Sequence, residues 1–465
     1  MADELWRQSA GGLATLIASG SVTSREVVAA HLARIEAVNP MLNAVVAVLA
    51  DTALAAADAA DAAVAAGMTL GPLHGVPFTV KANIDLVGSP TTHGVPAFAA
   101  AMPSMDAPVV ERMKAAGAIP IGRTNLPDMA LRVHTHSALH GLTRNPWHFN
   151  RTAGGSSGGE GAALASGMSP LGLGNDIGGS LRNPAFACGI ASLKPGFGRI
   201  PDASALEPRS PLLAAQLMAV QGPMARHVSD LQLALRVLGG AHRRDPWSIQ
   251  VALPSPAQPR IALVPEPPGG RTAPAIAAGV RAAGAALTAA GYEVVEIMPP
   301  LVEEAIAVWA QWLVAEFNTQ RGPMEAIMSN DAMAFFNAFA ALQPEVGFDS
   351  SVHLQVRRHM VARAWHEFLE DYPIIVGPTW CQPQFEHGFD IAGPDSAAEI
   401  LELMRFVTPM NLLGLPVACV PVGIADGLPL GVQIVGNHGK EELCLAVAMI
   451  IERAHGVITP IDPRH

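Results

Sequence analysis

The chain of 465 residues (48.3 kDa) is half apolar and only 15% charged, which is typical of a compact globular protein and excludes a disordered one. Its net charge of −11, without a basic cluster, excludes nucleic acid as a partner. No apolar run reaches the roughly 18 residues that a membrane-spanning helix needs, so no contact with a membrane is expected.

The N-terminus and the cysteines indicate the cell compartment. The N-terminus is acidic and lacks the basic start and apolar core of a secretory leader. The cysteines are far apart and form no CxxC motif, so they are expected to be reduced and buried. A cytoplasmic protein is therefore expected. The cysteines are Cys188, Cys381, Cys419 and Cys444.

The chain begins with two predicted helices, over 4–18 and 23–39. Thr23 or Ser24 is the expected N-cap of the second helix, and Pro40 is expected to end it. Helical and strand patterns then alternate, which predicts an α/β fold. In chain order they are helix 50–66, strand 76–80, helix 107–116, strand 118–122, strands within 167–176, 189–195 and 259–266, helix 273–291 and strand 292–298.

Residues 300–372 depart from this alternation because they are almost wholly helical and rich in large aromatic side chains. The strand pattern resumes in three later runs, at 372–380, 414–423 and 428–436. No internal repeat or long linker divides the chain. We therefore expect a single domain over 1–465 with a helical excursion at about 300–372, near the substrate pocket.

Three residues have the character of a nucleophile, a relay and a base. Lys81 ends the apolar run GVPFTVK, Ser156 lies in AGGSSGGEGAALASG, and Ser180 lies in GLGNDIGGSLRNPAFACG. Ser156 follows Lys81 by 75 positions, and Ser180 follows Ser156 by 24. Glycines beside a serine let a substrate carbonyl approach the backbone N–H groups. A buried lysine loses its proton near neutral pH and acts as a base.

The chain has so few lysines that each one can be considered as the candidate base. The chain has four, and Lys114 and Lys440 lie on amphipathic helices where they are expected to face solvent. Lys194, in GIASLKPGFG, is a second candidate for a buried base. The alternative for both Lys81 and Lys194 is a structural role in which the ammonium caps backbone carbonyls.

The loop NDIGGSLR is the predicted oxyanion hole. Its N–H groups from Ile177, Gly178, Gly179 and Ser180 are able to converge on one oxygen, and Asp176 and Arg182 are placed to hold the loop. The alternative is a surface turn held by that ion pair. The apolar sequence on both sides argues against exposure.

Other interpretations of these motifs are weaker. GGSSGG matches the G-x-S-x-G elbow of α/β-hydrolases, but the preceding WHFNRTA is not the apolar strand that the elbow requires. No GxxxxGK[ST] phosphate loop is present. His134, His136 and His140 are close together, yet no carboxylate or cysteine nearby completes a zinc site, so no metal is expected.

Taken together, these segments resemble the amidase signature family. The similarity spans roughly residues 5–245 and 373–455. It rests on GPLHGVPFTVKANID, DAPVVERMKAAGAIPIGRTNLPD, GLTRNPW, the long glycine–serine run into GIASLKP, QGPMARHVSDLQLAL, NLLGLPVACVPVG and GLPLGVQIVG, all in the family's order. The resemblance implies a mixed, twisted β-sheet covered by helices on both faces.

The resemblance also implies roles for particular residues. Ser180 would be the nucleophile, Ser156 a serine after a cis peptide bond, and Lys81 the base, supported by Ser157, with no metal or organic cofactor. This chain has Ala82 where the family often has aspartate, and Asn175 where threonine is common. The first departure is expected to alter how the lysine loop is held.

The implied activity is hydrolysis of small neutral amides, such as aryl or alkyl amides and anilides, with carbamates and esters as further substrates. Met129, His136, Trp309 and Trp380 are the candidate residues of the substrate pocket, the alternative for each aromatic being ordinary core packing. One rival function is an amidotransferase subunit that takes the amide of glutamine and works with a partner chain. A second is a non-catalytic binding protein on the same fold. The sequence leaves the oligomeric state open, with a homodimer among the expected forms.

Overall fold

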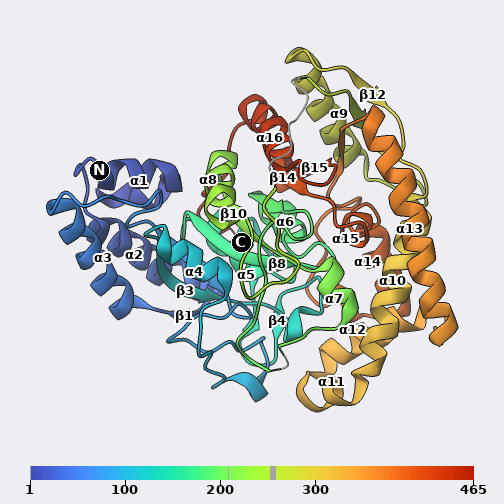
Figure 1. Ribbon diagram of the computed structural model, residues 1–465, viewed down its shortest axis with the longest axis horizontal. Coiled ribbons are helices and arrows are strands. Elements are labelled where there is room, and N and C mark those ends of the chain that lie inside the picture. Colours follow the sequence, from blue (N-terminus) through green and yellow to red (C-terminus); the bar gives the residue numbers. More distant parts are fainter. Residues whose placement is uncertain (1, 208, 252–257, 465) are drawn as a thin grey trace.

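The computed structural model describes residues 2–207, 209–251 and 258–464, and within these residues one mixed sheet of eleven strands forms the centre of the molecule (Figure 1). From one edge to the other its strands are β1 (Val45–Val48), β3 (Ile119–Thr124), β2 (Pro77–Lys81), β8 (Leu171–Asp176), β10 (Val220–Ala225), β9 (Ala191–Lys194), β14 (Val417–Ala425), β15 (Leu428–Gly436), β13 (Ile374–Pro378), β11 (Ile261–Leu263) and β12 (Val294–Glu296). Two small antiparallel pairs lie outside it, β4 (His136–Ser137) with β5 (Gly141–Leu142), and β6 (Arg144–Asn145) with β7 (His148–Thr152).

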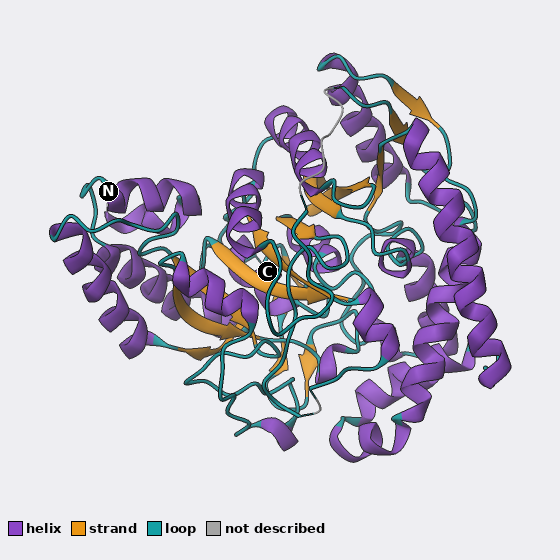
Figure 2. Ribbon diagram, viewed as in Figure 1, coloured by secondary structure: helices purple, strands orange, loops and turns teal. Residues whose placement is uncertain are grey.

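Helices surround this sheet (Figure 2). In chain order they are α1 (Ala10–Ala18), α2 (Ser24–Leu42), α3 (Ala50–Ala65), α4 (Pro108–Ala115), α5 (Gly158–Ala165), α6 (Arg182–Cys188), α7 (Leu213–Met218), α8 (Val228–Leu238), α9 (Pro274–Ala289), α10 (Val302–Thr319), α11 (Arg321–Ile327), α12 (Asn330–Ala341), α13 (Phe348–Asp371), α14 (Pro394–Leu403), α15 (Pro409–Leu412) and α16 (Glu441–His455). Short 3-10 turns occur at Ala2–Arg7, Pro96–Phe98, Asp128–Ala130 and Phe389–Ile391.

The core has two layers, one on each face of the sheet. Ile374 and Val376 of β13 pack into the cluster that includes α8, α9 and α16, whereas Ile375 between them packs into the cluster that includes α5 and α10. This alternation is the two-residue period of a strand buried on both faces. The expected fold, an α/β protein with helices on both faces of a mixed sheet, is therefore confirmed.

Two predicted helix boundaries were wrong at the N-terminus. The segment 4–18 is split, because Ser9 caps a new helix by accepting from the Gly12 N–H. The first two N–H groups of that helix donate to Asp230, 2.9 Å away in both cases. Pro40 lies inside α2 and does not end it. The helix ends at Leu42, and the next residue, Asn43, is its C-cap and adopts the left-handed conformation.

Most other predicted elements are confirmed, and the stretch 300–372 contains the helices α10 to α13. Figure 1 shows these helices at the end of the long axis opposite to α1, α2 and α3. The strand β10 and the helix α8 were not predicted as elements, although the sequence QGPMARHVSDLQLAL that forms them was noted. In the described part of the chain, no helix is both long and apolar enough to cross a membrane.

The pairing of β2 with β8 positions the candidate site. These strands are parallel neighbours, with Thr79 opposite Gly172 and Val80 opposite Leu173. Their carboxyl ends therefore meet at one edge, which brings Lys81 at the end of β2 beside the last residues of β8. Ligands and catalytic groups gather at such edges in α/β proteins.

Candidate active site

Lys81 and Ser156 form a direct hydrogen bond in the interior of the protein. Lys81 Nζ lies 2.7 Å from Ser156 Oγ, and both side chains are buried. Ser156 is held just before α5, whereas Ser180 lies between β8 and α6 and is 8% exposed. The structure therefore brings together the lysine and the first serine of the predicted set, with Ser180 at the adjacent loop.

The peptide bond between Gly155 and Ser156 is cis. A Cβ atom on Gly155 would lie 2.6–2.8 Å from the backbone of residues 132–134, so only glycine fits at this position. The carbonyl of Gly155 accepts a hydrogen bond from Asn183 Nδ2 at 3.1 Å. Close backbone packing on one side and the Asn183 amide on the other thus hold Ser156 in place.

The pKa of Lys81 is lowered to about 7, chiefly because its amine is fully buried. The carboxylates of Asp176 and Glu160 act in the opposite direction and keep the pKa from falling further. Glu160 accepts hydrogen bonds from Thr79 Oγ1 and, at 2.7 Å, from Thr124 Oγ1, and burial raises its own pKa to about 7. A large share of Lys81 is therefore unprotonated at neutral pH, as a general base must be.

Lys81 has a second partner that the sequence did not reveal. Its Nζ also lies 2.7 Å from Asn175 Oδ1, and Asn175 Nδ2 donates to Asn83 Oδ1 at 3.0 Å. Asn175 and Asn83 are half-buried. Ala82, the other departure from the family pattern, is buried and joins the loop through its backbone alone, donating to the Thr124 carbonyl.

Asp176 anchors the loop that carries Ser180. Its carboxylate receives two hydrogen bonds from Arg182, both 3.1 Å long, and one from Asn411 Nδ2. Burial alone would raise the pKa of Asp176, but the charge and hydrogen bonds of Arg182, the charge of Lys194 and the Asn411 hydrogen bond together outweigh it and hold that pKa far below the usual range. The predicted ion pair is therefore present, and it lies in the interior rather than in a surface turn. Asn411 opens the segment NLLGLPVACVPVG, but its contact with Asp176 could not be inferred because the two residues are 235 positions apart.

One of the four predicted oxyanion donors is already engaged. The Gly179 N–H donates to Asp176 Oδ1 at 2.8 Å, and the Leu181 N–H donates to the second carboxylate oxygen at 3.1 Å. The N–H groups of Ile177, Gly178 and Ser180 are the remaining candidates. Asp176 thus acts on the shape of this loop directly, through its backbone.

Two tryptophans of the predicted pocket contact this loop and the helix α6 that follows it. Trp309 on α10 is buried and donates to the Ile177 carbonyl at 3.0 Å. Its ring fills the space beside Gly178, where a Cβ atom would lie 2.6 Å from Trp309 Cζ2. Trp380 is fully buried and donates to Asn183 Oδ1 at 2.8 Å. Their contacts support the backbone around both serines.

The other predicted site residues are more varied in placement. Met129 is 37% exposed with a φ of 49°, and His136 is partly exposed with its ring 3.6 Å from Asp331. The Ser157 hydroxyl is buried and has no hydrogen-bond partner in the described part of the chain. Lys194 is buried and donates to the carbonyls of Pro195 and Leu415, which is the capping role considered for it.

The histidines considered as metal ligands do not converge. His134 hydrogen-bonds Thr152 Oγ1 and packs against the ring of His387, while His140 lies 3.3 Å from Thr92 Oγ1. Within residues 2–207, 209–251 and 258–464, no three His, Cys, Asp or Glu side chains are grouped so that they could hold a metal ion.

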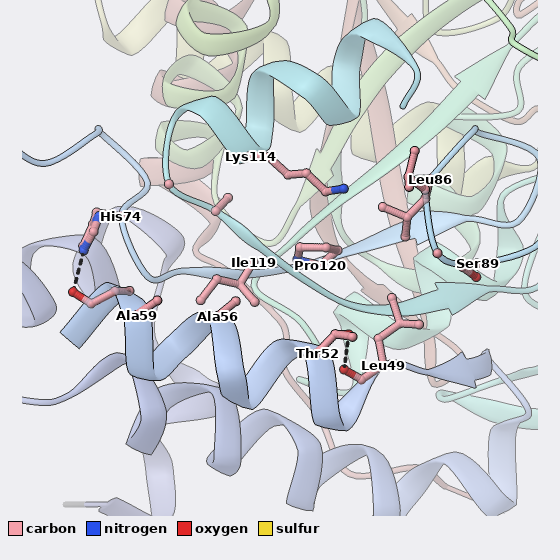
Figure 3. A pocket seen from close by; sticks show the side chains of 15 residues that line it. Leu49, Thr52, Ala56, Ala59, His74, Leu86, Ser89, Lys114, Ile119 and Pro120 are labelled. Carbon is pink, nitrogen blue, oxygen red and sulfur yellow. Dashed lines mark hydrogen bonds between the residues drawn. The ribbon is translucent and has the colours of Figure 1, made fainter. Parts of the chain in front are cut away.

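A surface hollow of about 510 Å³ lies away from these residues (Figure 3). It lies between α3, α4 and β3, and at one side of it His74 is hydrogen-bonded to the Ala60 carbonyl of α3 (Figure 3). None of the predicted site residues lines it. The hollow is therefore separate from the Lys81–Ser156 pair.

Comparison with known proteins identifies the chain's relatives. The family model described as Amidase matches residues 26–445. An indoleacetamide hydrolase of Bradyrhizobium diazoefficiens is 41% identical over 98% of this chain and 88% of its own length. One subunit of the glutamyl-tRNA(Gln) amidotransferase of Synechococcus sp. is 32% identical over 97% of this chain and 95% of its own length. The solved structure of 6-aminohexanoate cyclic dimer hydrolase complexed with substrate superposes with a TM-score of 0.85, at 29% identity and 99% coverage of both chains.

Proposed function

This chain belongs to the amidase family and is an amide-hydrolysing enzyme, and we propose that it cleaves the C–N bond of small neutral amides through an acyl-enzyme on Ser180. The observation that carries the proposal is the 2.7 Å contact between the buried Lys81 amine and Ser156 Oγ. A lysine with a pKa of about 7 next to a serine is suited to proton transfer and has no need of a histidine.

In the proposed mechanism, neutral Lys81 takes the proton of Ser156 while Ser156 takes that of Ser180. The Ser180 oxygen attacks the amide carbonyl, and N–H groups of Ile177, Gly178 and Ser180 stabilise the resulting oxyanion. Ser156 then passes its proton to the nitrogen of the leaving amine as the C–N bond breaks, and the Lys81 ammonium returns a proton to Ser156, so the amine is neutral again. Water hydrolyses the acyl-enzyme by the same relay, which restores all three side chains.

Primary amides of arylacetic acids are the first substrates to consider. The indoleacetamide hydrolase relative supports this class because the similarity covers 98% of the chain. Met129 and His136 are the partly exposed members of the predicted pocket, and the pair offers a thioether and an aromatic ring to an apolar substrate. Anilides, carbamates and esters remain in the proposed range. The four cysteines are free and buried, which supports a reducing, cytoplasmic location.

The amidotransferase relative favours one alternative, a glutaminase subunit that acts in a complex. That function requires glutamine as the amide donor and a partner chain. The purified chain alone should then hydrolyse glutamine in preference to arylacetamides, and a second protein should copurify with it from its own host.

The test is covalent capture of Ser180. Treatment with a fluorophosphonate should add one group to the wild-type protein by intact mass, and Ser180→Ala should lose both the adduct and at least about 10⁴-fold in kcat on an arylacetamide. Ser166→Ala, which removes another buried serine that is outside the predicted site, is the matched control and should keep the adduct. An adduct that survives in Ser180→Ala, or wild-type turnover by that variant, would overturn the proposal.

A further inference from the structure

Asn175 is hydrogen-bonded to the lysine base, and the proposed mechanism gives this contact no role. The Asn175 Oδ1 atom lies 2.7 Å from Lys81 Nζ, the same distance as Ser156 Oγ on the other contact. Asn175 is the penultimate residue of β8 and Lys81 the last residue of β2, so the parallel pairing of these two strands creates the contact.

The orientation of the Asn175 amide is fixed by a third residue. Its Nδ2 donates to Asn83 Oδ1 at 3.0 Å, which turns its oxygen toward Lys81. A side-chain amide oxygen accepts hydrogen bonds and has no proton to give. Asn175 is thus an acceptor for Lys81 whatever the protonation state of the amine.

This polarity determines where the lone pair of the neutral amine points. Neutral Lys81 has two N–H bonds and one lone pair, and one N–H is taken by Asn175 Oδ1. Asn175 cannot donate into the lone pair, whereas the Ser156 hydroxyl, at 2.7 Å, is able to. The lone pair is therefore left for the Ser156 proton. When that proton arrives, the ammonium still donates to Asn175, so Nζ does not have to move.

We propose that Asn175, held by Asn83, is a positioning residue that directs the lone pair of Lys81 toward Ser156 and keeps the amine in place during proton transfer. This inference rests on the proposed function, in which Lys81 is the base.

Other charged groups also act on Lys81. Asp176, which follows Asn175 on β8, and Glu160 on α5 act on the amine electrostatically, and Lys81 in turn acts on His93 in the loop after β2. The pKa of His93 is lowered to about 4, mainly by burial, so His93 is neutral when Lys81 titrates. The two carboxylates stabilise the ammonium form. A new negative charge at position 175 would add to their effect at hydrogen-bonding distance.

The test is the isosteric change Asn175→Asp, read by titrating Lys81 itself. Because the chain has only four lysines, [13Cε]lysine labelling gives four NMR signals, which single substitutions assign. The midpoint of the Lys81 signal should rise by about one to three pH units, as expected for an opposite charge at this distance. The acid limb of kcat/KM on an arylacetamide should rise with it, so activity lost at pH 7 should return at higher pH.

Two controls make the result specific. The Lys194 signal, from an amine that is equally buried but bonded to backbone carbonyls, should keep its midpoint. Asn83→Asp keeps an acceptor for Asn175 Nδ2 but places its charge one residue further from the amine, so the Lys81 midpoint should shift less. The midpoint shift shows that position 175 contacts the Lys81 amine. The positioning role itself is read from Asn175→Ala, because a merely structural role would leave kcat of that variant unchanged.

The outcomes separate this inference from the proposed function. An unchanged Lys81 midpoint in Asn175→Asp would overturn the inference. If the Lys81 NMR midpoint rises but the acid limb of kcat/KM stays where it is, Lys81 is not the base. The proposed function is then rejected as well. Should Asn175→Asp fail to fold, Asn175→Ala provides the answer, because losing the acceptor should lower kcat at least about tenfold with KM unchanged. An unchanged kcat in that variant would also overturn the inference.

Discussion

At the scale of single residues, burial of the Lys81 amine makes it a better base near neutral pH and also lowers the stability of the folded protein. Its pKa in the folded protein is about 7, against an ordinary value of 10.5. Between these two pH values the unfolded chain holds a proton that the folded chain lacks, so the stability of the folded state rises with pH across this window. Below pH 7 both states are protonated, and the full cost of burying the charge is present.

Lys81→Met should therefore be inactive and more stable than the wild type. The expected gain is ~1–4 kcal/mol at pH 6.5, because an apolar side chain of similar length replaces a buried charge. It should shrink toward pH 10, where the wild-type amine is neutral in the folded state. Denaturant midpoints at pH 6.5 and 9.5 measure this difference. Lys194→Met is the matched control and should gain less, because it leaves the Pro195 and Leu415 carbonyls without their donor. A Lys81→Met variant less stable than the wild type at pH 6.5 would contradict this account.

Some candidate site residues could be proposed from a short stretch of sequence, whereas others depend on contacts between distant parts of the chain. Lys81, Ser156 and Ser180 could be found in the sequence because a strand-ending lysine and glycine-flanked serines are local patterns. The contact between Lys81 and Asn175 could not, because it depends on β2 and β8 being parallel neighbours. Trp380 was placed in the pocket on its aromatic character, whereas its indole N–H is bonded to Asn183. Sequence patterns indicate that such a ring is buried but not which acceptor it finds.

At the scale of elements, α10 reaches the loop before Ser180 through the side chain of Trp309. The carbonyl of Ile177 and the N–H of Gly178 belong to one peptide unit and point in opposite directions. Trp309 holds that carbonyl at 3.0 Å and packs its ring beside Gly178. The position of α10 therefore determines where the Gly178 N–H points.

Trp309→Phe should keep the ring packing and lose the hydrogen bond to Ile177. We expect kcat to fall about 3–10-fold with little change in KM, because the bond is worth about 1 kcal/mol and acts on a group that serves the transition state. The affinity for a boronic acid inhibitor, which mimics the tetrahedral intermediate, should fall in parallel. Trp312→Phe is the control, since that indole bonds Glu316 on its own helix. Equal effects of the two substitutions would argue against a role of Trp309 in the loop.

The elements themselves were predictable where their signals were local. Apolar runs predicted most strands of the sheet, and the capping box of Thr23 and Glu26 marks the start of α2. Pro40 was misjudged because a proline in the last turn removes only one donor, and the helix continues to Leu42. The break before Ser9 depends on Asp230, more than 200 residues away, which accepts from the start of α1. The strand order had no counterpart in the sequence pattern.

At the scale of the whole molecule, the last strands of the chain lie in the middle of the sheet. β14 pairs with β9, and β15 pairs with β13. These two strands therefore link the part of the sheet built from the first half of the sequence to the part built from the second half. The helices α10 to α13 are hydrogen-bonded at several points to a turn and to helices outside this segment. The Ser329 N–H donates to Asp128, the Ala214 N–H donates to Glu316, and Arg358 donates to the Leu412 carbonyl.

These ties predict that the helical segment and the sheet unfold together. Labelling with 5-fluorotryptophan provides reporters in both parts, because Trp309, Trp312 and Trp365 are buried in the helical segment while Trp147 and Trp380 are buried elsewhere. In a urea titration followed by 19F NMR, all five native signals should disappear with one midpoint, as expected for a cooperative transition. Single Trp→Phe variants assign the signals. Loss of the three helical signals at a clearly lower urea concentration would mean that α10 to α13 form a separate folding unit, and the Trp309 contact with Ile177 would then be too weak to hold the loop before Ser180 in one position.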